Sequence, residues 1–305
     1  MESSSPGRGY RAAGPSVRAI PVDDLAIGGA NAPINDYETA DLAGITVGSA
    51  ARLQKQLPGD VPLDALIVNR GTSVVVVALH GATDRAKTQL PRFEWLRSML
   101  EYEVSCIFFG DPSLHLSPKL LLAWYTGWET ADVQAEVAAW SKRIADAIGA
   151  TRVIFMGASG GGFAALQTSA LLDGSEALAF NAQTDIARYR VNGESWGVQR
   201  DYIQTVWPGI WNELATADAY QDGSWASIAG ERVSAVTRYS SRRRNLVHLV
   251  QNEEEFHYDE HFLPFIDAAR AAGNEVLTHT NREGSLHNPP RQVTFQRHMA
   301  DVLGQ

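Results

Sequence analysis

One serine lies in a glycine-rich turn of the kind that nucleophilic serines occupy. Residues 157–161 read Gly-Ala-Ser-Gly-Gly, the spacing G-x-S-x-G, between an apolar run at 152–156 and a segment of small residues. Glycines two positions before and two after the serine allow a sharp, strained turn from a strand into a helix. The first N–H groups of that helix can stabilise an oxyanion. We therefore predict that Ser159 is a nucleophile for acyl transfer.

The same glycines allow a second interpretation, an anion-binding turn built on Gly157, Gly160 and Gly162. No lysine follows that could reach a phosphate. A dinucleotide-binding turn normally follows the first strand of its domain, whereas at least two strand-like runs precede this one. These two observations favour the nucleophile.

A nucleophilic serine needs a base, and the base needs a carboxylate that holds it in one tautomer. After such a strand–turn–helix serine the order along the chain is acid, then histidine. His287 stands in a Gly- and Pro-marked loop after the last apolar run, Glu275–His279. We predict that His287 is the base, with an uninvolved surface histidine as the alternative.

The acid is expected just past the preceding apolar run, which ends at Asn252. In serine hydrolases, which this arrangement resembles, the acid commonly stands three positions after a turn residue, and this resemblance implies Glu255. Glu254 and Asp259 remain alternatives, and Asp185 is a reserve candidate after an earlier run.

The loop after the first central run supplies the other half of an oxyanion hole. It reads Leu-His-Gly-Ala-Thr at 79–83. We expect one N–H from Ala82 or Thr83 and a second from Gly160. His80 is expected to form structural hydrogen bonds there rather than to act in catalysis.

A second pattern, His-Tyr-Asp-Glu-His at 257–261, matches the zinc-binding spacing H-x-x-E-H. The sequence offers no clear further ligand for a metal on His257 and His261. We therefore expect a coincidental match, and we predict neither a metal nor an organic cofactor.

Short apolar runs that alternate with helix-period segments surround these residues. Runs that are apolar on both faces suit strands buried between helices, so we predict an α/β fold with a doubly wound, mostly parallel sheet. The runs are Val74–Leu79, Val104–Phe109, Arg152–Met156, Ala177–Phe180, Leu246–Val250 and Glu275–His279. Helices are expected from Val133 to Ile148, before Gly149, and from Phe262 to Ala272.

The alternation of strands and helices predicts how the chain is divided into a tail, a domain and an insertion. Residues 1–20 are rich in Ser, Gly, Arg and Pro and are expected to be a disordered tail. Residues 21–305 are expected to form one domain, with a helical cap or lid inserted at 186–240. That insertion is rich in tryptophan, and the alternative is that its aromatic side chains belong to the main core: Trp196, Trp207, Trp211 and Trp225.

The overall charge limits the partners. The 305 residues carry a formal charge of −9, which disfavours binding to nucleic acid or to anionic membrane surfaces. No signal-peptide-like core and no apolar run of membrane-spanning length occurs. We therefore expect a cytoplasmic protein without nucleic-acid or membrane partners, although leaderless export or assembly into a virion would leave the same pattern.

From about residue 60 to the end, the order His80-Gly81, G-x-S-x-G, carboxylate, His287 resembles the α/β-hydrolase superfamily. Several shorter phrases are similar to a bacterial group linked to surface-polysaccharide and accessory-secretion loci. They begin at Asp111 (DPSL), Leu122 (LAWYxG), Asn181 (NxQTD), Val250 (VQN) and Phe262 (FLPF). The resemblance implies an esterase or acyl-transfer activity on a glycan or glycoprotein. The superfamily usually has aspartate where this chain offers glutamate.

Three further residues are expected to line the substrate pocket: Asp111, Trp124 and Tyr125. They follow the strand before the nucleophile strand. The alternative is an Asp-Pro turn and buried core aromatics. The expected partner is a small-molecule or glycan ester, and the function classes left open are a serine esterase, an acyltransferase with the same residues, and a non-catalytic binding module.

Overall fold

The computed structural model describes residues 14–191, 194–195, 197–216 and 218–305. Residues 1–13 of the predicted tail and Trp196 of the predicted cap therefore lie outside the described residues.

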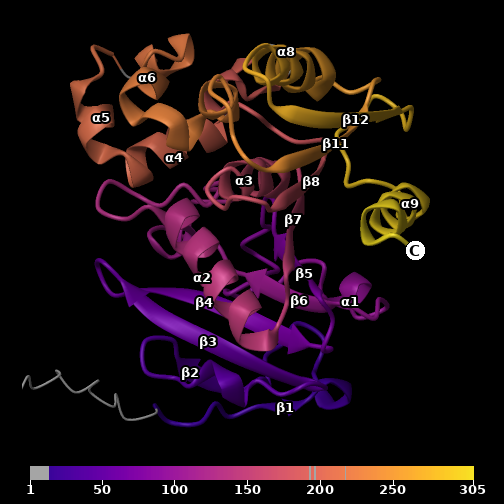
Figure 1. Cartoon of the computed structure of the whole chain (residues 1–305). Coiled ribbons are helices and arrows are strands. Elements are labelled where there is room, and N and C mark those ends of the chain that lie inside the picture. Colours follow the sequence, from indigo (N-terminus) through magenta and orange to yellow (C-terminus); the bar gives the residue numbers. More distant parts are fainter. Residues whose placement is uncertain (1–13, 192–193, 196, 217) are drawn as a thin grey trace, which may run out of the picture.

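The main sheet crosses the whole molecule (Figure 1). Over the described residues it has ten strands, in the order β1-β3-β4-β6-β5-β7-β8-β11-β12 with β2 beside β3. The strands from β6 to β12 run parallel, whereas β3 and β4 are antiparallel to their neighbours on the main path. This arrangement confirms the predicted mostly parallel α/β sheet. The bounds are β1 Ile20–Pro21, β2 Ile34–Asp36, β3 Ser49–Leu57, β4 Val61–Asn69, β5 Val74–Leu79, β6 Ser105–Phe109, β7 Arg152–Ala158, β8 Glu176–Phe180, β11 Leu246–Asn252 and β12 Glu275–Asn281.

Helices cover both faces of the sheet (Figure 1). One core lies between the sheet and α1 and α9, and a larger one lies between the sheet and α2, α3 and α8. The bounds are α1 Leu96–Met99, α2 Val133–Ile148, α3 Gly160–Ser169, α8 Leu263–Ala271 and α9 Gln292–Leu303. Helix α2 ends at Gly149, whose φ of 78° is left-handed, as the sequence predicts. Among the described residues, no helix is long and apolar enough to cross a membrane.

The segment between β8 and β11 is largely helical. It contains a short hairpin, β9 Arg190–Val191 and β10 Glu194–Ser195, followed by α4 Gly197–Val206, α5 Pro208–Glu213, α6 Trp225–Ala229 and α7 Ala235–Arg238. Helices α4, α5 and α6 lie together at one corner of the molecule (Figure 1). Trp207 and Trp225 are buried in the larger core. These two tryptophans thus pack with the main core, and the division of the chain into a hydrolase domain with an inserted cap or lid at 186–240 stays a prediction.

Candidate active site

Ser159 sits on a strained turn at the carboxyl end of β7. Its φ is 54° and its ψ is −119°, a conformation that side-chain-bearing residues rarely adopt. Strand β7 ends at Ala158 and helix α3 begins at Gly160, so the serine occupies the predicted strand-to-helix turn. The residue is partly exposed, which leaves its Oγ within reach of a substrate.

The flanking glycines are required by close packing. A Cβ on Gly157 would lie 2.3 Å from the carbonyl of Gly161. A Cβ on Gly161 would lie 2.4 Å from the carbonyl oxygen of Leu79, at the end of β5. Real side chains do not tolerate such distances, because the backbone on both sides cannot move away. The turn therefore needs glycine at both positions to place Ser159 above β5 and β7.

His287 and Glu255 extend from Ser159 as a hydrogen-bonded series. His287 Nε2 lies 2.8 Å from Ser159 Oγ, and His287 Nδ1 lies 2.8 Å from Glu255 Oε2. A carboxylate only accepts hydrogen bonds, so Nδ1 carries the proton and Nε2 accepts from the serine hydroxyl. The His287 side chain is 22% exposed and that of Glu255 is fully buried. This is the geometry of a general base held by an acid.

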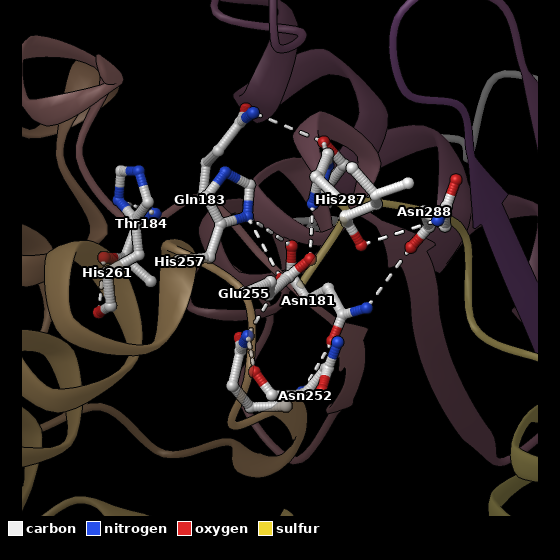
Figure 2. A network of polar contacts seen from close by, with 12 residues as sticks. Asn181, Gln183, Thr184, Asn252, Glu255, His257, His261, His287 and Asn288 are labelled. Atoms are coloured by element: carbon white, nitrogen blue, oxygen red, sulfur yellow. Dashed lines mark hydrogen bonds and ion pairs between the residues drawn. The ribbon is translucent and has the colours of Figure 1, made fainter. Parts of the chain in front are cut away.

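Glu255 is surrounded by donors without a permanent charge. Gln251 Nε2 donates to its Oε1 at 2.9 Å, and His257 Nδ1 lies 3.6 Å from the same oxygen. Figure 2 shows Glu255 between the side chains of His257 and His287.

The other candidate acids have different partners. Glu254 is exposed and accepts from the N–H of Gly284 at 2.6 Å, and Asp259 is exposed. Asp185 accepts from the N–H of Ala187 and from Ser234 Oγ, so it caps a short helical turn. Of the four candidates, the hydrogen bond to His287 is formed by Glu255.

Two asparagines, which the sequence gave no reason to single out for this role, tie the three loops together. Asn181 Oδ1 accepts from the N–H of Asn252 at 2.9 Å, and its amide donates to the carbonyl of Asn288 at 3.3 Å. Asn252 in turn donates to the carbonyl of Gly284 at 2.6 Å and accepts from the N–H of Glu283 at 3.1 Å. Asn181 falls in a phrase noted above only for its resemblance, whereas Asn252 was noted as the turn residue three positions before Glu255.

His257 and His261 of the H-x-x-E-H pattern are buried beside the site (Figure 2). His257 Nδ1–H donates to the carbonyl of Asn181 at 3.0 Å, and its ring centroid lies 4.1 Å from that of His287. Burial lowers the pKa of His257 well below its ordinary value and that of His261 to about 3. Both rings are therefore neutral at physiological pH, and they add no positive charge next to His287.

A different set of residues has the spacing of metal ligands. One ligand atom each of Glu255, His257 and His287 lies within 4.8 Å of the others. The Nδ1 atoms of both histidines already donate hydrogen bonds, to Asn181 and to Glu255, so these lone pairs are not available to a cation in this arrangement. The absence of a metal requirement stays a prediction.

The loop at 80–83 passes directly beside the serine. A Cβ on Gly81 would lie 3.9 Å from the Cβ of Ser159. The N–H of Thr83 donates to the carbonyl of Leu121 at 2.7 Å and is already used. The N–H of Ala82 has no partner among the described residues, and Gly160 stands in the first turn of α3, where backbone N–H groups have no intrahelical partner. Of the predicted oxyanion donors, Ala82 and Gly160 are thus the two that remain available.

His80, Asp111 and Tyr125 form a buried network beneath this loop. His80 Nδ1–H donates to the carbonyl of Gly81 at 2.8 Å, and its Nε2 accepts from the N–H of Asp111 at 3.0 Å. The Asp111 carboxylate accepts from the N–H of Tyr125 at 2.8 Å, and the Tyr125 hydroxyl donates to the carbonyl of Phe109 at 2.8 Å. Burial lowers the pKa of His80 to about 4 and raises that of Asp111 to about 6. His80 therefore has the structural role that the sequence suggested.

The three predicted pocket residues are all buried: Asp111 is 2% exposed, and Trp124 and Tyr125 are 0% exposed. Asp111 and Tyr125 form hydrogen bonds with each other and with the backbone. This arrangement corresponds to the alternative considered from the sequence, an Asp-Pro turn and buried core aromatics. Trp124 packs edge-on against Tyr202 of α4 and donates its indole N–H to Gln183. Gln183, which falls in the phrase at 181–185 noted above only for its resemblance, donates to Ser159 Oγ at 3.3 Å.

The sequence matches no family model and no curated protein, whereas several solved structures are similar. The capsule O-acetyltransferase of Neisseria meningitidis serogroup A superposes with a TM-score of 0.57 at 15% identity, covering 83% of this chain and 94% of the other. Carboxyl esterase 2 of the mycorrhizal fungus Tuber melanosporum gives 0.54 at 13% identity, covering 84% and 83%. The glycosylation-associated Gap123 complex of Streptococcus agalactiae gives 0.56 at 14% identity, covering 83% and 47%.

At these low identities the likeness establishes the fold and no more. The strand order, the serine turn after β7 and the superposition agree with one another. The chain has the α/β-hydrolase fold, which it shares with esterases and with an O-acetyltransferase.

Proposed function

We propose that this protein is a serine esterase that cleaves an acyl ester through a covalent acyl-serine intermediate. The observation that carries the proposal is the pair of 2.8 Å contacts from Ser159 Oγ to His287 and from His287 to Glu255. A serine hydroxyl is a weak nucleophile on its own and needs a base at this distance.

The chemistry runs in two halves. Ser159 Oγ attacks the acyl carbon while its proton moves to His287 Nε2, and the protonated imidazole is stabilised by Glu255. The N–H groups of Gly160 and Ala82 stabilise the oxyanion, and His287 returns the proton to the leaving alcohol. Water then attacks the acyl-serine with His287 as base, which releases the acid and restores the hydroxyl.

A fluorophosphonate probe, which phosphonylates activated serines, tests this proposal. We expect stoichiometric labelling of the wild-type chain and none of Ser159→Ala, with both proteins melting at the same temperature. Labelling that persists in Ser159→Ala would remove the assignment of the nucleophile. An unlabelled wild-type chain would instead support a non-catalytic binding module on the same scaffold.

A second candidate is acyl transfer to a sugar hydroxyl by the same residues. It is favoured by the similarity to a capsule O-acetyltransferase over nearly the whole of that chain. The two candidates differ in the acceptor that attacks the acyl-serine. p-Nitrophenyl acetate turnover, followed with and without added oligosaccharide, separates them: an acyltransferase forms acetylated sugar at the expense of free acetate, and an esterase does not.

A further inference from the structure

Gln183 is a buried side chain that contacts the proposed nucleophile in addition to its base. It follows β8, in the loop that leaves the sheet next to Ser159, and it is 0% exposed. Its Nε2 lies 3.3 Å from Ser159 Oγ, and Figure 2 shows the Gln183 side chain close to those of His257 and His287. The amide end of this contact is thus shielded from water, whereas Ser159 is partly exposed.

The orientation of the Gln183 amide is set by its hydrogen bond with the Trp124 indole. The indole N–H of Trp124 can only donate, so the amide atom that faces it must be the oxygen. The Nε2 atom must therefore face Ser159.

The direction of every hydrogen bond in this series then follows. Glu255 accepts from His287, whose Nε2 accepts from the Ser159 hydroxyl, so the serine proton is committed to the base. The serine oxygen is left as an acceptor for the Gln183 N–H. Each group therefore donates a hydrogen bond to the next, from the Trp124 indole through the Gln183 amide, the Ser159 hydroxyl and the His287 ring to the Glu255 carboxylate.

We propose that Gln183 is a further catalytic residue, which donates a hydrogen bond to Ser159 Oγ and stabilises the negative charge that develops on it. The proposal rests on the proposed function. In acylation, the charge appears as the O–H bond breaks and the proton moves to His287, before the new bond to the acyl carbon is complete. In deacylation, it appears again as the bond between Oγ and the acyl carbon breaks and Oγ recovers its proton from His287. A fixed donor at Oγ favours both steps.

Trp124 acts in this scheme as a positioning residue. It does not contact Ser159 in the series described, but it occupies the amide oxygen and prevents a flipped amide from presenting that oxygen to Oγ. Two acceptors facing each other would repel and would compete with His287 for the serine proton.

The rate of fluorophosphonate labelling tests the proposal on the full chain. We expect Gln183→Ala to slow labelling by about tenfold or more, the cost of one lost donor at a reacting oxygen. Gln183→Glu keeps the shape and can donate only while protonated, so its rate relative to wild type should fall as the pH rises through the pKa of the new carboxyl. Trp124→Phe should slow labelling less, and the Trp124→Phe/Gln183→Ala pair no more than Gln183→Ala alone.

A matched control is Gln199→Ala, because Gln199 is also 0% exposed and its amide donates to the backbone carbonyl of Ile186. It should label at the wild-type rate. Wild-type rates in Gln183→Ala, or a Gln183→Glu to wild-type ratio that does not change with pH, would overturn the catalytic role of Gln183 while leaving Ser159 as the nucleophile. A wild-type chain that does not label at all would overturn the esterase proposal itself, and this inference with it.

Discussion

Two glutamate–histidine pairs lie at opposite ends of the parallel strands. Glu255 and His287 follow the carboxyl ends of β11 and β12, whereas Glu176 and His248 lie near the amino ends of β8 and β11, 3.2 Å apart. Arg152 forms a bidentate contact with Glu176, but the donors around Glu255 other than His287 are neutral.

The difference lies in what balances each carboxylate. Burial raises the pKa of Glu176, but hydrogen bonds from His248 and Arg152 outweigh it and lower that pKa to about 2. Its charge is thus already neutralised by a permanent cation. Glu255 has no permanent cation among the contacts described above, so in the proposed mechanism its carboxylate can stabilise the imidazolium that forms when His287 takes a proton.

The largest expected effect separates the two histidines. His287→Ala should reduce ester turnover by about a thousandfold or more, because the serine loses its base. His248→Ala should leave turnover within about twofold, since His248 pairs with Glu176 near the amino ends of the strands, away from Ser159. Comparable losses in both variants would show that the two pairs do not differ as described.

Replacing the acids gives the next largest effect. Glu255→Gln should lower kcat by about a hundredfold to ten-thousandfold, because an amide can donate to Nδ1 and favours the wrong tautomer of His287. Glu254→Gln, one residue away, is the matched control and should stay near wild type. A large loss in the Glu254 variant with a small one in the Glu255 variant would transfer the acid role to Glu254.

The pair of Glu176 and His248 is expected to contribute to the free energy of unfolding rather than to turnover. Because the folded pKa of Glu176 lies below its ordinary value of 4.5, its charge stabilises the fold above that pH, and the contribution is lost as the pH falls toward 2. Glu176→Gln should therefore cost on the order of 1–2 kcal/mol at neutral pH, reduced by the solvent exposure of Arg152, and the cost should shrink below pH 4.5. Thermal melting from pH 7 to pH 2.5 measures this, and a cost that is unchanged at low pH would contradict it.

The smallest expected effect is that of chelation. If Glu255 serves His287 rather than a cation, excess EDTA should change ester turnover by less than about twofold. Loss of activity with EDTA, and its recovery with Zn²⁺, would instead assign Glu255, His257 and His287 to a metal site. The contrast between Glu255–His287 as a catalytic pair and Glu176–His248 as a structural pair would then no longer hold.

The parallel strands could be predicted from the sequence because each is a short run that is apolar on both faces. The predicted run 152–156 corresponds to β7 Arg152–Ala158, and 246–250 to β11 Leu246–Asn252. The serine turn can be predicted as well, because the G-x-S-x-G spacing is local. The steric need for glycine at 157 is also local, since its Cβ would meet Gly161, whereas the need at 161 comes from Leu79 on another strand.

The side-chain network around the site could not be predicted in this way. Asn181 and Asn252 are 71 positions apart, and Trp124 and Gln183 are 59 apart, so no local pattern pairs them. Asp111 illustrates the opposite difficulty. An aspartate next to a proline suggests an exposed turn, but two backbone N–H groups satisfy its carboxylate and allow it to be buried.

The contact between Ser159 and His287 joins residues 128 positions apart. The base reaches the serine only after β8, β11 and β12 have added to the sheet in register. During refolding, reactivity toward a fluorophosphonate should therefore return last, after helical signal and tryptophan burial have recovered. The time course of Ser159 labelling during refolding therefore reports when the carboxyl-terminal half of the sheet has formed.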